Sequence, residues 1–152
     1  GLLATTLPRP PAHTVARPVA RPAEVRGHSL RCVILPQTIC PAADLIDANL
    51  RGANLVGAYL SGANLDHANV SRANLSSADL SHATLSYAYG SGAILIRARL
   101  TGANLSATVL NGADLSYADL RGAILEDANL RGAQITGARF DGASMRGCDG
   151  CP

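Results

Sequence analysis

Four cysteines are the residues of this chain with the most evident chemistry, and they come in two pairs. Cys32 and Cys40 lie eight positions apart, and Cys148 and Cys151 lie three positions apart. Four thiolates can hold a zinc ion, whereas two thiols at close range can form a disulfide. Which of these applies depends on the fold that places the two pairs relative to each other.

Histidines are the next candidates for chemistry, and their spacing matches no catalytic or metal-binding motif. His67 and His82 stand alone in the sequence, as do His13 and His28. The chain also has no phosphate-binding loop and no serine nucleophile motif. The sequence therefore predicts a protein that is not an enzyme and has no cofactor or metal, with its histidines on the surface.

A strict five-residue repeat dominates the chain and must position these residues. A leucine occupies every fifth position from Leu45 to Leu65, and an apolar residue continues this period to Met145 except at Gly90. Alanine stands two residues before almost every one of these central positions, and a polar residue, most often Asn or Asp, lies between them. Such a triplet alternates apolar, polar and apolar side chains, which is typical of a short extended segment with one buried face.

This period is incompatible with a helix, because five residues advance by about 140° around an axis with 3.6 residues per turn. Extended triplets joined by corners keep every alanine and leucine on one inner side, so the chain must coil. Glycine recurs at the second position after the centre in two sets spaced by multiples of twenty. These are Gly52, Gly92, Gly112 and Gly132, and Gly62, Gly102, Gly122 and Gly142. We therefore predict a four-sided coil of twenty residues, with type II turns at glycine corners and another turn at the intervening corners.

These residues resemble the pentapeptide-repeat family, whose consensus of Ala, Asn or Asp, Leu and two variable residues stands here as Ala-Asn-Leu-Arg-Gly at 48–52 and 128–132. The resemblance covers residues 43–147, or 21 repeats. It implies an all-β fold, a right-handed quadrilateral parallel β-helix. About five coils at roughly 4.8 Å each would form a rod about 25 Å long. The expected parts are a Pro- and Arg-rich extended arm at 1–28, an N-terminal cap at 29–42, the β-helix at 43–147 and a C-terminal cysteine clip at 148–152.

The rod excludes a single zinc site, since it separates the two cysteine pairs by about 25 Å. We expect two local disulfides, Cys32–Cys40 and Cys148–Cys151, that secure the ends of the coil, with free thiols as the alternative. Disulfides would place the protein in an oxidising compartment. Thylakoid-lumen members of the family also have capped, disulfide-secured ends, and this resemblance makes the thylakoid lumen the first choice. A secreted, periplasmic or cytoplasmic location is the alternative.

Stacking by twenty residues places alternating charges in one outer column. Tyr59 is followed in that column by Asp79, Arg99, Asp119 and Arg139. We interpret this column as a solvated, self-neutralising face in which each ion pair contributes about a few tenths of a kcal/mol. Some members of the family inhibit DNA gyrase by presenting a DNA-like acidic surface. This chain has 13 basic and 11 acidic residues, so its composition does not favour such an acidic surface. A DNA-mimicking topoisomerase regulator is therefore only the alternative function. We expect no nucleic-acid partner.

Apolar residues occupy several outward positions in one region. Tyr89 and Val109 fall on one face, and Ile94 and Ile96 point outward from the adjoining face. Gly90 removes a central leucine there, and we expect Tyr89 to fold over the gap. Contiguous exposed apolar residues on a soluble protein mark contact surfaces. We predict that these four residues dock a partner, with tolerated surface residues as the alternative.

The first 28 residues are rich in proline and arginine and contain one acidic residue, Glu24. Such a segment cannot build a core of its own. We expect the arm, with Arg9, Arg17 and Arg21, to contact partner subunits; packing along the coil and binding to nucleic acid or anionic lipid are the alternatives. The chain does not begin with Met, and its Arg-rich start is compatible with part of an organelle-targeting segment. No apolar run approaches the roughly 18 residues that span a membrane.

The sequence therefore predicts a non-catalytic structural or interaction subunit. In this hypothesis a rigid β-helical rod is held in a larger protein assembly by its arm and its apolar patch. A lumenal accessory subunit of a photosynthetic complex is the specific form of the hypothesis.

Overall fold

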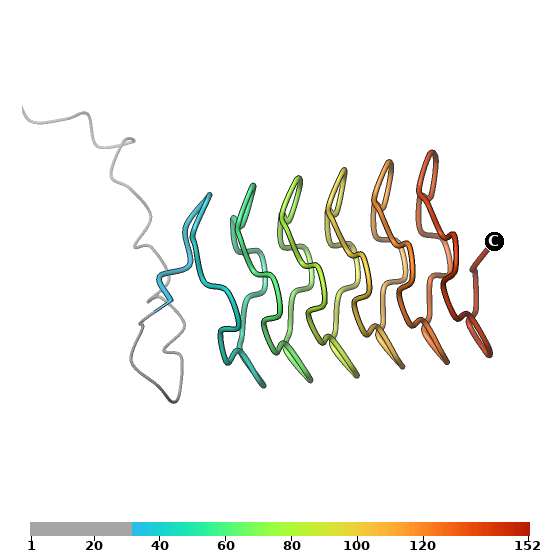
Figure 1. The fold of residues 1–152 in the computed structure, drawn as a ribbon, viewed down its shortest axis with the longest axis horizontal. Coiled ribbons are helices and arrows are strands. Elements are labelled where there is room, and N and C mark those ends of the chain that lie inside the picture. The colour runs from blue at the N-terminus through green and yellow to red at the C-terminus, as the bar shows by residue number, and fades with distance from the viewer. Residues whose placement is uncertain (1–31) are drawn as a thin grey trace, which may run out of the picture.

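The computed structural model describes residues 32–152, which wind into one regular solenoid (Figure 1). This range contains no helix and no strand longer than a single bridged residue. Bridged residues occur at every fifth position from Ile39 to Asp149, and they pair in parallel with residues twenty positions away. This register confirms a four-sided coil of twenty residues.

Four columns of bridged residues define the sides of the coil, which we number in chain order from Asp44. Side 1 contains Asp44, Asn64, Thr84, Asn104, Ile124 and Ser144, and side 2 contains Asn49, Asn69, Tyr89, Val109, Asn129 and Asp149. Side 3 contains Asn54, Asn74, Ile94, Asp114 and Gln134, and side 4 contains Ile39, Tyr59, Asp79, Arg99, Asp119 and Arg139. Sides 1 and 3 are therefore opposite each other, as are sides 2 and 4.

Backbone hydrogen bonds between successive coils hold each side together. On side 1 the Asn64 amide donates to the Ala43 carbonyl at 2.9 Å, and the Leu45 amide donates to the Asn64 carbonyl at 2.7 Å. The same two bonds recur from coil to coil on the other sides. Each coil thus depends on its immediate neighbours, as in other solenoids.

The inward positions form a core of stacked alanine and leucine side chains. Ala98 and Leu100 are both 0% exposed, and most other inward residues are equally buried. Thr108 takes one alanine position, and its hydroxyl donates to the Leu85 carbonyl at 2.7 Å. The fully buried Thr108 hydroxyl therefore has a partner, as buried polar groups require. Side chains fill the interior, so any binding site must lie on the outer surface or at an end.

All corners share one turn, so the prediction of two turn types is wrong. At the second residue after each centre, φ is positive both at glycine, as in Gly62 (68°), and at other residues, as in Asp47 (58°). The next residue donates back to the central carbonyl, as Ala48 does to Leu45 at 3.0 Å. This combination is typical of a type II turn. Non-glycine corners accept a left-handed φ, which costs about 1–2 kcal/mol, because their amides bond the next coil, as Asp47 does to the Asp66 carbonyl at 3.0 Å.

The polar residue between alanine and leucine caps the following corner. The Asn54 Oδ1 atom, for example, accepts a hydrogen bond from the Val56 amide at 3.3 Å. The residues that act in this way are Asp44, Asn49, Asn54, Asn64, Asn69, Asn74, Asp79, Asn104, Asp114, Asp119 and Asn129. Each bond contributes about 1 kcal/mol, which explains why Asn and Asp are preferred there over other polar residues.

Coil pairing extends beyond the predicted boundaries of the β-helix. The Gln37 amide donates to the Val56 carbonyl at 2.8 Å, so the second half of the predicted cap at 29–42 already belongs to the coil. Asp149, in the predicted C-terminal clip, bridges Asn129. The coil continues past the consensus residues because its backbone pairing does not require them.

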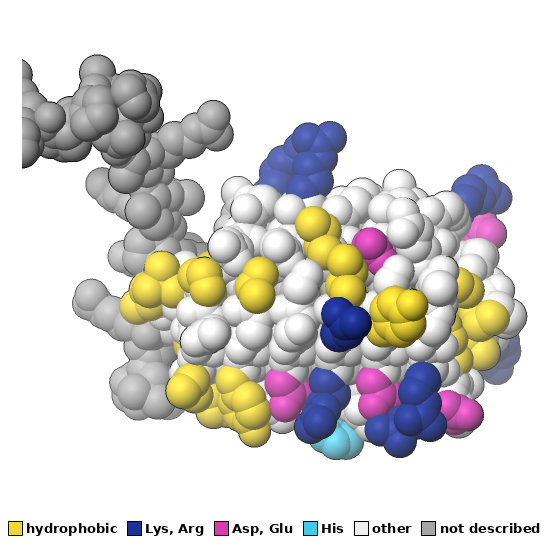
Figure 2. Space-filling view, turned by 90° about the horizontal axis from the view of Figure 1, so that it is seen from above, with side chains coloured by type: hydrophobic (Ala, Val, Ile, Leu, Met, Phe, Trp, Pro, Cys, Tyr) yellow, Lys and Arg dark blue, Asp and Glu magenta, His cyan; other side chains and the backbone are white. Residues whose placement is uncertain are grey.

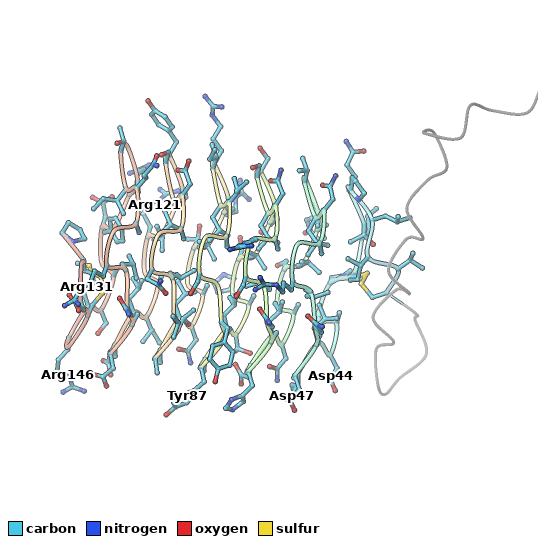
Figure 3. The ribbon with its side chains drawn as sticks, turned by 180° about the vertical axis from the view of Figure 1, so that it is seen from behind. Asp44, Asp47, Tyr87, Arg121, Arg131 and Arg146 are labelled. Carbon is cyan, nitrogen blue, oxygen red and sulfur yellow. A yellow bond between two sulfur atoms is a disulfide. The ribbon has the colours of Figure 1, made fainter. Side chains whose placement is uncertain are left out.

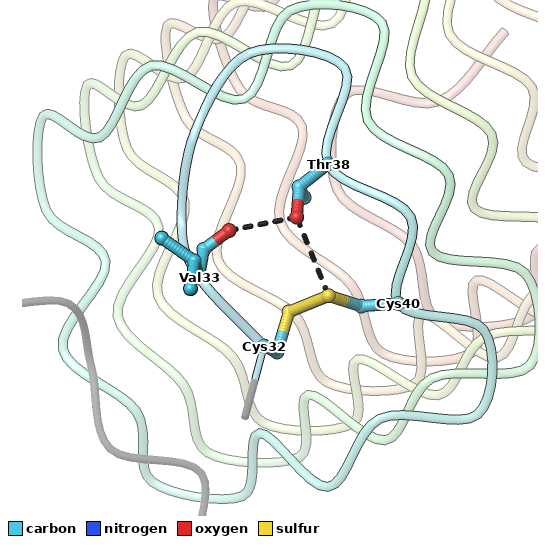
Figure 4. The surroundings of a disulfide bond; sticks show 4 residues. All are labelled: Cys32, Val33, Thr38 and Cys40. Carbon is cyan, nitrogen blue, oxygen red and sulfur yellow. Dashed lines mark hydrogen bonds between the residues drawn. A yellow bond between two sulfur atoms is a disulfide. The ribbon is translucent and has the colours of Figure 1, made fainter. Parts of the chain in front are cut away.

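Both cysteine pairs are disulfides in the structure. They are Cys32–Cys40 and Cys148–Cys151, each with Cα atoms 5.7 Å apart. Figure 4 shows the first disulfide beside Thr38, whose hydroxyl donates to the Val33 carbonyl at 2.7 Å. All four cysteines of the chain are bonded in this way, so none is a free thiolate that could bind zinc.

Candidate interaction surfaces

Side 2 carries the aromatic part of the predicted docking surface. Tyr89 and Val109 are bridged to each other, so their side chains lie on neighbouring rungs of the outer surface. Tyr89 is 57% exposed. Asn69 and Asn129 flank the pair in the same column. The structure therefore brings Tyr89 and Val109 together as one small apolar surface.

Gly90 leaves a space in the core, and a leucine of the next coil occupies it. A Cβ atom added at Gly90 would lie only 2.8 Å from the Leu110 Cδ2 atom. The prediction that Tyr89 folds over this gap is therefore wrong. The tyrosine stays exposed because Leu110 already fills the space.

Side 3 and the corner that follows it carry the aliphatic part of the predicted surface. Ile94 lies between Asn74 and Asp114 in its column, and Ile96 is the first residue of the next corner. Both isoleucines are half-buried. They lie on the side that adjoins Tyr89, so the predicted residues form one patch on each of two adjoining sides.

The apolar residues of both patches replace the side chains that cap corners elsewhere. The Ile96 amide, two residues after Ile94, has no side-chain acceptor among residues 32–152. On the rungs before and after it, Asn74 and Asp114 cap the equivalent amides at 3.1 and 2.9 Å. The apolar pair on side 2 leaves its corners uncapped in the same way. Each of these positions forgoes about 1 kcal/mol, and so do Tyr59, Arg99 and Ile124, which likewise cap no corner amide among residues 32–152.

Two further groups of exposed side chains were not predicted from the sequence. Ile39, 77% exposed, bridges Tyr59 on side 4. At one corner the Tyr87 and His67 rings stack with their centroids 5.3 Å apart, and Figure 3 shows Tyr87 projecting outward from the coil. In both groups the partners are twenty residues apart, so the coil period was the signal that could have found them.

Side 4 carries the alternating charges, and the ion pairs form within a coil and not along the column. Asp119 binds Arg121 at 2.6 Å, and Arg139 lies 3.5 Å from Asp141. Figure 2 shows a row of alternating acidic and basic side chains on this part of the surface. Side 4 therefore lacks the uniform negative charge of a DNA-like surface.

The neighbours of the Asp119 carboxylate strongly lower its pKa. The hydrogen bond from the Arg121 side chain lowers the pKa of Asp119 to about 2 from its ordinary value of 3.8. The Arg121 amide and the charges of Arg121 and Arg139 act in the same direction, and partial burial opposes them. Because this pKa is lower in the folded chain, ionised Asp119 stabilises the fold above about pH 4, and the contribution is lost as the pH falls through about 2.

Replacing Asp119 with asparagine should reveal this contribution. The asparagine side chain retains the oxygen that caps the Arg121 amide but loses the ion pair. At pH 7 we expect Asp119→Asn to lower the free energy of unfolding by about 1 kcal/mol, less than the pKa shift alone implies, because the Arg121 side chain is 45% exposed and screened by water. Denaturant titrations of both proteins at several pH values check this. The difference should shrink as the pH falls from about 4 and disappear below about pH 2, and a difference that persists unchanged over this range would contradict the assignment.

Several predictions from the sequence concern residues for which the structure provides no geometry. Arg9, Arg17 and Arg21, with the rest of the arm at 1–28, lie outside the described residues. Within residues 32–152, no three His, Cys, Asp or Glu side chains form a group that could hold a metal ion. The same part of the chain has no helix with the length and hydropathy to cross a membrane.

The repeat of this chain matches a known family model. The model for pentapeptide repeats matches residues 43–81, 73–112 and 113–149, with eight copies. The chain belongs to the pentapeptide-repeat family. Pentapeptide-repeat proteins form right-handed quadrilateral β-helices, and they are generally structural or interaction proteins without enzymatic activity. The family thus accounts for the coil and for its filled interior.

Two solved pentapeptide-repeat structures are similar to this chain. One, from the cyanobacterium Cyanothece 51142, is 41% identical with a TM-score of 0.59 over 60% of this chain. The other, from the thylakoid lumen of Arabidopsis thaliana, is 34% identical with a TM-score of 0.58 over 65% of this chain. The matches cover 63% and 66% of those two chains. No curated protein sequence matches this pentapeptide-repeat chain significantly.

Proposed function

We propose that this chain is a non-catalytic interaction subunit, a β-helical rod that docks into a larger protein assembly. The observation that carries this proposal is the loss of corner caps at Tyr89, Val109 and Ile94. These positions hold apolar side chains at the expense of a stabilising hydrogen bond, which is the expected pattern when a surface is retained for a partner. Ile96 extends the surface on side 3, and the arm at 1–28 is a second attachment.

We further propose that the protein works in the thylakoid lumen as an accessory subunit of a photosynthetic complex. Two observations support this location. A similar structure comes from the thylakoid lumen of Arabidopsis thaliana. Two disulfides also fit an oxidising compartment. The partner would be a protein surface with apolar side chains at its centre and polar groups at its rim.

Charges placed on side 3 test the docking surface. In size-exclusion chromatography of thylakoid-lumen extract, tagged wild-type chain should co-elute with a large assembly. Ile94→Asp plus Ile96→Asp should elute as free protein, because two desolvated carboxylates oppose an apolar contact. The matched control is Asn74→Asp plus Ser76→Asp, which puts the same charges on the preceding rung and should co-elute like wild type. Retention of the isoleucine variant in the assembly would refute docking at this surface.

A further inference from the structure

Side 4 carries a charge pattern with a symmetry of its own. Asp79, Arg99, Asp119 and Arg139 occupy successive rungs and are joined by parallel bridges; we call these four residues the charge stripe. The two arginines are exposed and the two aspartates are half-buried. The signs run negative, positive, negative, positive, with neighbouring rungs about 4.8 Å apart.

An alternating stripe with an even number of charges is complementary to itself when it is turned end to end. The relevant two-fold axis lies in the plane of contact between two copies, perpendicular to the rod and midway between the rungs of Arg99 and Asp119. This axis places Asp119 of the second copy opposite Arg99 of the first. It also places Arg139 of the second copy opposite Asp79 of the first. All four contacts then join opposite charges. A parallel alignment in the same register would place like charges opposite each other, which is unfavourable.

The corner beside the stripe follows the same symmetry. Within one chain the Arg97 guanidinium lies 5.5 Å from the centre of the Tyr117 ring. The two-fold axis that pairs the stripes also places Arg97 of one copy on the rung opposite Tyr117 of the other. Tyr117 is 57% exposed, so its ring is accessible to a second arginine. Cation–π contacts would therefore add to the contacts between the stripes.

We propose that the charge stripe is a self-association surface, through which two copies of this chain pack side by side and antiparallel. Arg99 is the central residue of this contact, since it forms no ion pair among the described residues, whereas Asp119 is already bound by Arg121. The interface is isologous, with the same surface on both copies. Tyr89 and Val109 lie on side 2, opposite the stripe, whereas Ile96 precedes Arg97 at the corner beside the stripe.

Sedimentation velocity of the full 152-residue chain over a range of concentrations tests this proposal. We expect a concentration-dependent dimer in about 0.1 M salt. In about 1 M salt, where the Debye length falls from about 10 Å to about 3 Å, dimer dissociation should rise about tenfold or more. A chain that remains monomeric at all concentrations in low salt would overturn the proposal.

Three variants assign the contact to the stripe. Arg99→Asp sets a carboxylate opposite Asp119 at two symmetric places and should raise the dissociation constant about tenfold or more. Arg72→Asp makes the same change of charge at a corner between sides 2 and 3 and should leave the constant unchanged. Arg99→Asp plus Asp119→Arg restores opposite charges at both places and should restore the dimer. Equal effects of the two single variants, or failure of the double variant to restore the dimer, would overturn the proposal.

Discussion

Truncation of Leu100 to alanine is expected to lower the free energy of unfolding by about 3 kcal/mol. Leu100 is 0% exposed and stacks in the core of side 4 between Leu80 and Leu120, which are equally buried. The neighbouring coils cannot collapse into the resulting cavity, because backbone bonds such as that from the Leu100 amide to the Asp119 carbonyl, at 2.7 Å, fix their spacing. The cost therefore includes both the lost burial of the side chain and the cavity.

The matched control for Leu100→Ala is Arg99→Ala, one position earlier and on the outside. We expect it to change the free energy of unfolding by no more than about 0.5 kcal/mol. Urea unfolding followed by circular dichroism, at protein concentrations too low for association, measures both variants. Similar losses for Leu100→Ala and Arg99→Ala would contradict the assignment of inward and outward positions.

Enlarging the alanine of the same triplet should be comparably damaging. Ala98→Leu places three additional carbons between Ala78 and Ala118, which are both 0% exposed. We expect a loss of about 3 kcal/mol, since a packed core accommodates extra volume only by distorting its side chains and backbone. Thermal and urea unfolding of the variant would measure this loss.

Arg99→Leu is the control for this substitution, because it introduces the same side chain at the next position. We expect its effect to be within about 0.5 kcal/mol of wild type. If leucine were tolerated equally well at positions 98 and 99, the alanine positions would not line a filled interior.

The architecture could be predicted from the sequence because one structural rule repeats. Leucine at every fifth position, with alanine two residues earlier, is compatible only with extended triplets and corners. The pairing of Ile39 with Tyr59, and of each later rung with the next, confirms the coil of twenty residues. Burial of Leu55 and Ala58 likewise follows from the position of each residue in its triplet.

Details that depend on neighbouring coils could not be predicted. Non-glycine corners such as Tyr87 have a positive φ, because bonds to the next coil outweigh the local preference of the residue. The filling of the space at Gly90 depends on the side-chain conformation of Leu110. The pairing of Asp119 with Arg121 depends on side-chain reach, which favours a residue of the same coil over the column neighbour. In the first two cases the deciding contact joins residues about twenty positions apart, and in the third it depends on a side-chain conformation.

The proposed docking surface combines a sequence pattern with a structural one. Apolar residues at outward positions identified Tyr89, Val109, Ile94 and Ile96, but the reason for their significance was missing. That reason is the corner cap, in which a side-chain oxygen accepts from the amide two residues later, as in Asn74 and Ser76 at 3.1 Å. A preference for Asn and Asp over Ser or Gln at this position was the available signal.

The central claim is that these outward apolar residues serve a partner and not the fold, and replacing Tyr89 and Ile94 with asparagine tests it most directly. Asn69 and Asn74 cap the corners one coil earlier at 3.0 and 3.1 Å. The double variant should gain the same bonds and become about 1–2 kcal/mol more stable. In size-exclusion chromatography of native extract, the double variant should nevertheless elute as free protein, whereas the wild-type chain should elute with the large assembly. A variant that is less stable than wild type and still co-elutes with that assembly would contradict the claim.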